Sequence, residues 1–263
     1  MLIYAASVTF PHDNVQYVVN QLAIRISLKR LYQTSVTICL IEAAFFTWII
    51  LRALRSQPAR RPVTAFWFLT VLLVLGTWRL LTANNTELVH YPQYIPEGAA
   101  LLALTLSPID SMAWIAIFGG LDECFQYWTI MKGRPVGYDM NDIYMDLLGG
   151  AAGMLIAMAF LRCENRPIRT SIFRLRGVQA LLGIMLAGIV LILSGVVLIY
   201  QDRSNLNYWF ALSRDKPPAY WYINPLFGPH RFHTLSPVEG PILILLTLGI
   251  YTILERRVQV VAK

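Results

Sequence analysis

Long apolar stretches separated by short polar linkers make up most of this chain. A helix that crosses a membrane needs about 20 mostly apolar residues. Stretches of this kind predict seven helices, at residues 33–52, 63–81, 91–107, 111–130, 140–161, 178–200 and 239–254. The third is short and carries Pro92 and Pro96, and the seventh is also short, so six spans is the alternative. The pattern predicts an all-α fold, a polytopic transmembrane helical bundle of six to seven spans.

Composition supports the membrane interpretation. Hydrophobic residues make up 56% of the chain and charged residues 14%, with a mean hydropathy of +0.52. A soluble domain is nearer half apolar and about a quarter charged. The net charge of +7 is then expected to mark cytoplasmic loops and not a nucleic-acid partner. Cys39, Cys124 and Cys163 form no metal or redox motif, so we expect them to be small apolar core residues.

Arginines in two linkers predict the orientation. The linkers 52–62 and 162–176 are both rich in arginine, and cytoplasmic loops carry an excess of positive charge. Four predicted spans separate them, which places both on the same side. The basic C-terminal tail then lies in the cytoplasm and the N-terminus outside, although Arg25, Lys29 and Arg30 argue mildly against this. We expect the protein in a bacterial inner (cytoplasmic) membrane.

The predicted organisation follows from these spans. Its parts are an N-terminal segment that could form an interfacial helix (1–30), two transmembrane helices (31–82), a core of three transmembrane helices (83–162), a further transmembrane helix (178–200), an aromatic loop on the outer surface (201–238), and a C-terminal helix with a basic tail (239–263).

Three consecutive helices of the core each carry one polar stripe. Helical residues at i, i+3, i+4 and i+7 share a face. The stripes are Glu87, His90, Tyr94 and Glu97; then Gly119, Asp122, Glu123 and Gln126; then Asp139, Asp142 and Asp146. All three lie toward the same, outer, end of their spans. We therefore expect them to meet.

The stripes contain more acids than nearby bases, which are His90, Lys132 and Arg134. Three arrangements could accommodate this excess of acidic side chains. Some acids could be protonated by burial and like charge. A hard divalent cation could be bound through oxygen ligands, with Asp122, Glu123 and Asp142 as candidates. The site could also be open to water.

These residues carry a resemblance to a known family. The stretch from Glu87 to Gly153 resembles the VanZ-like family of bacterial membrane proteins, over about a quarter of the chain. That family pairs an H-aromatic-x-x-Tyr motif with a later D-E-x-x-Q, Arg, D-x-x-D-x-x-x-N-x-x-G pattern. The matching residues are His90, Tyr91, Tyr94, Asp122, Glu123, Gln126, Arg134, Asp139, Asp142 and Gly149. Asp146 departs, because the family usually has Asn there, and the loop around Tyr138 differs slightly in length.

The resemblance implies a membrane protein that acts on the cell envelope, since the founding member is associated with teicoplanin resistance. The implied partners are membrane lipid or a lipid-linked envelope precursor. It implies no established reaction, so whether this chain is an enzyme stays open.

The stripes and the resemblance together define the site candidates. These are Glu87, His90, Asp122, Glu123, Gln126, Arg134, Asp139 and Asp142. In an enzymatic version, a divalent ion would polarise a phosphate, Arg134 would neutralise charge, and His90 or Glu87 would move a proton. In a binding or transport version, the acids would bind a cation or cationic head group, or relay protons. In a structural version, the cluster only locks the helices together.

Three further features are expected to have simpler roles. Gly149 and Gly153 form a G-x-x-x-G pattern that lets helices approach closely. Glu42 is a lone acid within the first span, expected to pair with another polar group of the bundle. His230 and His233 are expected to lie in a surface loop.

Overall fold

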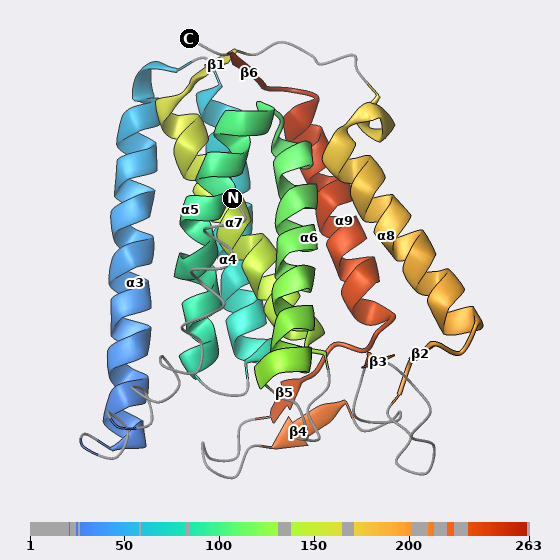
Figure 1. Cartoon of the computed structure of the whole chain (residues 1–263). Coiled ribbons are helices and arrows are strands. Elements are labelled where there is room, and N and C mark those ends of the chain that lie inside the picture. Colours follow the sequence, from blue (N-terminus) through green and yellow to red (C-terminus); the bar gives the residue numbers. More distant parts are fainter. Residues whose placement is uncertain are drawn as a thin grey trace.

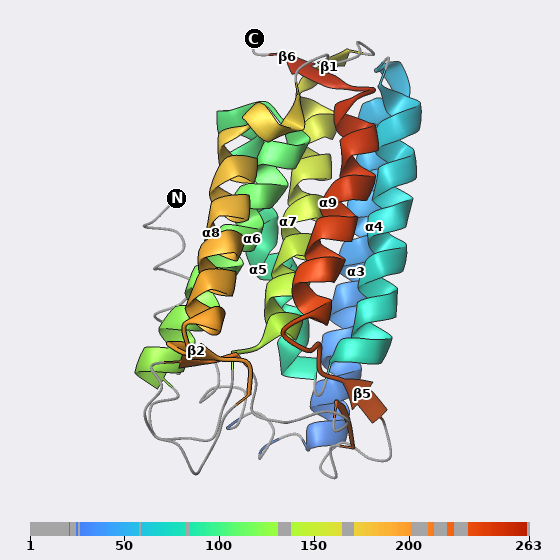
Figure 2. The same ribbon diagram turned by 90° about the vertical axis from the view of Figure 1, so that its right-hand side faces the viewer.

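The structure is a computed structural model that describes Gln21, Arg25 and residues 27–57, 59–82, 85–130, 138–164, 171–200, 210–212, 220–223 and 231–261. Within this part of the chain, seven long helices run side by side as a bundle (Figure 1, Figure 2). They are α3 (Leu28–Ala53), α4 (Arg60–Leu81), α5 (His90–Thr105), α6 (Pro108–Phe125), α7 (Met140–Phe160), α8 (Arg176–Leu193) and α9 (Glu239–Glu255). Every predicted apolar stretch is therefore confirmed as a helix.

Two predicted helices differ at their C-terminal ends. Helix α8 ends at Leu193, seven residues short of the predicted end at 200, because the chain turns at Gly195. Gly195 has a φ of 76°, a left-handed conformation that glycine adopts without steric cost. The predicted helix 111–130 changes character at Gln126, where α6 passes into a π-helical turn, Gln126–Ile130.

Four of the helices are long and apolar enough to cross a membrane, among the residues that the structure describes. Their spans are Gln33–Ala53, Arg60–Leu81, Met140–Phe160 and Arg176–Leu193. In α7, 83% of the span is buried inside the protein, whereas in α3 only 6% is. Helix α7 is thus the centre of the bundle, and α3 lies at its edge.

Glycines let α5 and α7 pack backbone against backbone. A Cβ atom at Gly98 of α5 would lie 1.9 Å from the carbonyl oxygen of Gly150. A Cβ at Gly153 of α7 would lie 1.9 Å from the carbonyl oxygen of Ile95, and one at Gly149 would lie 2.4 Å from that of Tyr91. No side chain larger than hydrogen fits at these distances. The packing role predicted for Gly149 and Gly153 is confirmed.

Short elements cover the two ends of the bundle. Strands β1 (Arg162–Glu164) and β6 (Gln259–Val261) pair antiparallel at one end. At the other end β2 (Val197–Leu198) pairs in parallel with β3 (Phe210–Ala211), and β4 (Trp221–Ile223) pairs antiparallel with β5 (Arg231–His233). Single turns of 3-10 helix span Leu54–Ser56, Asn85–Val89 and Ile172–Arg174. Figure 1 places β1 and β6 at the top and β2 to β5 at the bottom.

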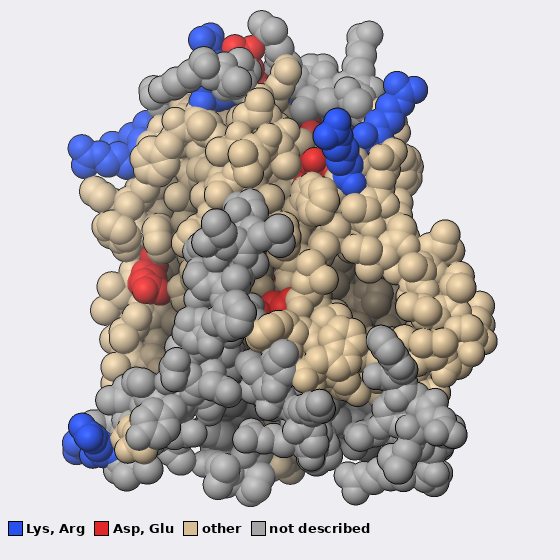
Figure 3. All heavy atoms as spheres, viewed as in Figure 1, with Lys and Arg blue, Asp and Glu red and all other residues tan. Residues whose placement is uncertain are grey.

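Basic side chains gather at the end that carries β1 and β6. On the face seen in Figure 3, most of the Lys and Arg side chains that are drawn in blue lie at the top, and the described residues below them are mostly uncharged. The α3–α4 and α7–α8 connections both lie at this end. The described parts of the two arginine-rich linkers therefore share one end of the bundle. Much of the predicted outer loop (201–238) and most of the predicted N-terminal segment (1–30) lie outside the described residues.

Candidate functional site

His90 stands at the centre of a buried polar cluster. It is the first residue of α5 and lies against two acids of α7 that share one face, four residues apart. Its Nδ1 is 2.8 Å from Oδ1 of Asp146, and its Nε2 is 3.6 Å from Oδ2 of Asp142. The side chain of Asp146 is 1% exposed and that of Asp142 is 17% exposed. Asp142 is therefore the accessible edge of this histidine–acid group, and Asp146 is its buried back.

Helix α6 adds a second group of polar side chains. Gln126 Nε2 donates to Oε1 of Glu123 at 3.0 Å and to Oδ2 of Asp122 at 3.2 Å. The other oxygen of Glu123, Oε2, accepts from the backbone N–H of Asp139 at 3.1 Å. The three side chains are buried. Gln126 begins the π-helical turn and still reaches both acids of the preceding turn.

The two groups form one cluster. Glu123 of α6 accepts from the N–H of Asp139 at the start of α7. Asp142 and Asp146, on the same face of α7, contact His90 of α5. The three predicted stripes thus meet at one end of the bundle, beside the described parts of the predicted outer loop.

The cluster continues inward to Glu97, which the sequence placed in the α5 stripe but not among the site candidates. Glu97 is 2% exposed, two helical turns beyond His90. Asp146 and Asp122 are the acids that act most strongly on it. Within the described residues, Glu97 Oε1 and Asp146 Oδ2 are buried and have no hydrogen-bond partner. The seven-residue interval from His90 was the signal that would have included it.

Asp139 has a structural task in this arrangement. It is the N-cap of α7, and its Oδ1 accepts from the backbone N–H of Asn141 at 2.9 Å, as capping aspartates do. Beside it, the hydroxyl of Tyr138 donates to the carbonyl of Gly120 at 3.2 Å. Burial raises the pKa of the Tyr138 hydroxyl, so this group stays a hydrogen-bond donor.

Asn141 lies at the end of the bundle that holds the His90 cluster, and the sequence pattern did not indicate its role. Its Nδ2 donates to the carbonyls of Leu81 and His233, each at 2.8 Å, and its Oδ1 accepts from the N–H of Leu235 at 2.7 Å. It therefore fastens the segment after β5 to the start of α7. His233 also lies 3.2 Å from Glu239 through its Nε2. An isolated Asn next to an acidic stripe gives no sequence signal for this role.

The remaining candidates stand less centrally. Glu87 is half-buried in the turn just ahead of α5. Arg134 and Lys132 lie outside the described residues, as does His230. Among the described residues, no group of three or more His, Cys, Asp or Glu side chains is arranged to hold a metal ion. The predicted ligand set Asp122, Glu123 and Asp142 is not such a group, so a bound divalent ion stays a prediction.

The opposite end of the bundle holds two further buried acids that the sequence analysis did not single out. Asp110 Oδ1 accepts from the backbone N–H of Gly177 at 2.6 Å, which ties α6 to α8. Glu255 Oε2 accepts from the backbone N–H of Ile109 at 3.2 Å, which ties α9 to α6. Both acids satisfy main-chain donors near the first turn of a helix, where such donors lack partners.

Comparison with known proteins adds no relative: no protein-family model, no curated protein and no solved structure matches this chain.

Proposed function

We propose that this chain is a VanZ-like integral membrane protein in which the His90 cluster binds the polar head of a lipid or of a lipid-linked envelope precursor. The observation that carries the proposal is His90 held between Asp142 and Asp146, with Glu123 and Gln126 from a neighbouring helix beside it. Ionisable side chains within spanning segments are rare and usually functional.

The proposed topology has six or seven spans in the bacterial cytoplasmic membrane. The arginine-rich end with β1, β6 and the C-terminus faces the cytoplasm, because positive loops are retained there. The His90 cluster then faces outward, near the outer leaflet. A lipid head group or envelope precursor is present on that side.

The chemistry of the cluster suits a polar head with both donors and acceptors. Carboxylates accept hydrogen bonds from hydroxyl or ammonium groups, and a protonated imidazole donates to phosphate. In an enzymatic version His90 or Glu87 would move a proton and Arg134 would neutralise a phosphate, with a divalent ion polarising it. In a binding version the same groups would hold the head without breaking a bond.

A lipid comparison tests this function. A deletion strain would be complemented with the wild-type gene, Glu123→Gln or Asp142→Asn, and its lipids profiled by mass spectrometry. Both amides keep the shape of the side chain and remove its charge. We expect both variants to reproduce the deletion profile, whereas Asp110→Asn, which changes an acid at the opposite end, should restore the wild-type profile.

Folded Glu123→Gln and Asp142→Asn proteins that restore a wild-type lipid profile and envelope would overturn the proposal. The polar cluster would then be a structural lock between helices.

A cation- or proton-binding function is the second candidate, favoured by one buried oxygen each of Glu97 and Asp146 that makes no hydrogen bond among the described residues. A metal titration of the purified protein, followed by thermal unfolding, distinguishes a divalent-ion version. Absence of a thermal shift with Mg²⁺, Mn²⁺ or Ca²⁺ would eliminate it.

A further inference from the structure

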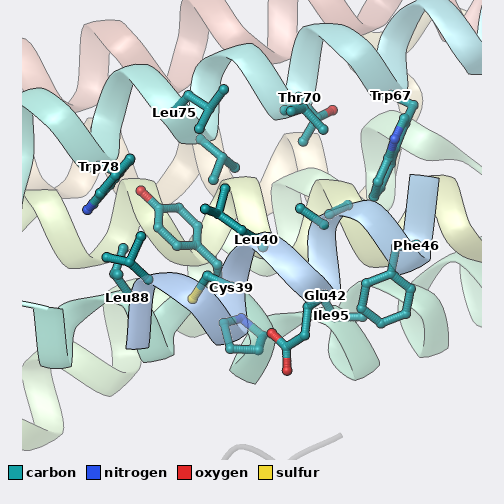
Figure 4. Close-up of a pocket in the computed structure, with 18 residues that line it drawn as sticks. Cys39, Leu40, Glu42, Phe46, Trp67, Thr70, Leu75, Trp78, Leu88 and Ile95 are labelled. Atoms are coloured by element: carbon teal, nitrogen blue, oxygen red, sulfur yellow. The ribbon is translucent and has the colours of Figure 1, made fainter. Parts of the chain in front are cut away.

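A groove lies on the side of the bundle between α3 and helices α4, α5 and α7. It encloses about 130 Å³. In Figure 4, Cys39, Glu42 and Phe46 reach it from α3, and Trp67, Thr70 and Leu75 reach it from α4. The three α3 residues share one face of that helix, at intervals of three and four.

The lining presents almost only carbon to the groove, because most of its polar atoms are already bonded. The hydroxyl of Thr70 pairs with the hydroxyl of Tyr251 and with the carbonyl of Phe66. The indole N–H of Trp67 donates to Oγ1 of Thr47 at 2.9 Å. Among the described residues that line the groove, Glu42 is the only one with a charged side chain.

The groove adjoins the His90 cluster through the seam between α5 and α7. Tyr91, which lines the groove, follows His90 directly, and its hydroxyl bonds to Thr77 Oγ1 at 2.6 Å. Gly149 also lines the groove and lies one turn of α7 beyond Asp146. One turn of helix therefore separates the apolar lining from Asp146, the fully buried acid of the polar cluster.

The surroundings of the groove indicate what fills it. Outward-facing apolar side chains flank it on both helices, with Ile41 of α3 62% exposed and Leu72 of α4 65% exposed. In a bilayer such faces contact hydrocarbon. The volume is below the roughly 300 Å³ of typical small-molecule sites. It is close to that of an engineered apolar cavity of about 150 Å³ that stays dry and binds benzene. A segment of hydrocarbon chain fits this space, and a hydrated head group does not.

We propose that this groove holds the hydrocarbon chain of the lipid whose polar head is bound at the His90 cluster. The inference rests on the proposed function and adds where a segment of the aliphatic chain of that lipid lies. The tail runs along α3 beside the α5–α7 seam. A hydrated head group does not fit the apolar lining, so the molecule is oriented with its head at the polar cluster.

Neighbouring alanines of α3 provide a matched test. Ala43 lines the groove, whereas Ala44 is exposed and does not. The purified protein would be placed in vesicles of phosphatidylethanolamine and phosphatidylglycerol with a phospholipid that carries a photoactivatable diazirine in its acyl chain. Cross-linked peptides from α3 and α5 would be quantified by mass spectrometry.

Labelling of groove residues should fall about tenfold in Ala43→Phe, the change given by roughly 1.4 kcal/mol of lost binding free energy. It should stay at the wild-type level in Ala44→Phe. Should Ala43→Phe fail to fold, Leu75→Trp fills the same groove from α4, with Leu72→Trp as its exposed control. Equal labelling in each groove variant and its control would overturn the proposal that this groove holds a hydrocarbon chain.

The head-site variant Glu123→Gln separates this inference from the proposed function. Groove labelling is independent of the lipid-profile test, because the probe reports the chain and not the head. If groove labelling persists in Glu123→Gln, the groove binds the hydrocarbon chain of the lipid even if the head group is bound elsewhere. Labelling that is absent in the wild type overturns the chain site and leaves the lipid-profile result intact.

Discussion

Buried acids occupy both ends of this bundle, and they are used differently. At the arginine-rich end, Asp110 and Glu255 each accept a backbone N–H from a neighbouring segment. At the other end, Asp142 and Asp146 lie against the side chain of His90, and one oxygen of Asp146 has no partner among the described residues. Burial alone therefore does not mark an acid as functional.

The partner of each carboxylate distinguishes the two ends. An acid that satisfies a main-chain donor stabilises the fold, since the donor would otherwise be buried without an acceptor. An acid that faces another ionisable side chain adds little to the fold, because removing two charges from water costs free energy that their attraction barely offsets. Glu123 lies between these cases, since one oxygen accepts from Asp139 and the other from Gln126.

The largest effect on stability is expected at the glycine contact between α5 and α7. In Gly98→Val, the added side chain would collide with the backbone of Gly150 and force α5 away from α7. We expect a loss of more than about 4 kcal/mol of unfolding free energy, the exceptional range for one substitution. Denaturant unfolding in detergent measures it. Gly183→Val in α8 is the control, because nothing lies within 4 Å of the Cβ position there. Equal stability of the two variants would show that the seam tolerates separation.

A smaller effect is expected at the arginine-rich end. Asp110→Ala removes the acceptor of the Gly177 N–H and should cost about 1–3 kcal/mol of unfolding free energy, the penalty for a buried unsatisfied donor. Asp110→Asn keeps an oxygen in place and should recover most of the loss. The same unfolding assay applies. An alanine variant as stable as the wild type would remove the structural role of this acid.

The smallest effect on stability is expected for Asp146→Asn. The amide keeps an oxygen for His90 and removes one negative charge from a cluster of buried acids, so the unfolding free energy should fall by less than in Asp110→Ala. Unfolding of Asp146→Asn and Asp110→Ala side by side tests the contrast directly. If Asp146→Asn proves the less stable of the two, the distinction between the ends fails, and the His90 cluster is part of the structural framework.

Much of the fold followed from hydrophobic pattern, but the ends of helices did not. Apolar runs located all seven helices, since helix length and burial are local properties of the chain. The C-terminal end of α8 was predicted too late because Val196–Leu198 is as apolar as the helix before it, and only the conformation of Gly195 separates them. Periodicity cannot detect such a turn.

The sequence predicted which helix faces form the site, but it did not predict which hydrogen bonds their side chains make. Spacing correctly brought His90 to the acids of α7, because each stripe lies on one side of its helix. Spacing could not show that Asp139 caps α7 or that Asn141 holds the segment after β5. It also could not single out Asp110, whose partner Gly177 is 67 residues away. These tasks depend on which backbone groups tertiary packing brings near.

The glycine seam between α5 and α7 also constrains how the protein is made. Helices emerge from the ribosome in sequence order, so α6 is complete before α7 exists. During that interval α5 cannot pack against the glycines of α7. The side chains of His90 and Glu97 then have no α7 acids beside them. The polar cluster therefore cannot close until α7 has been synthesised.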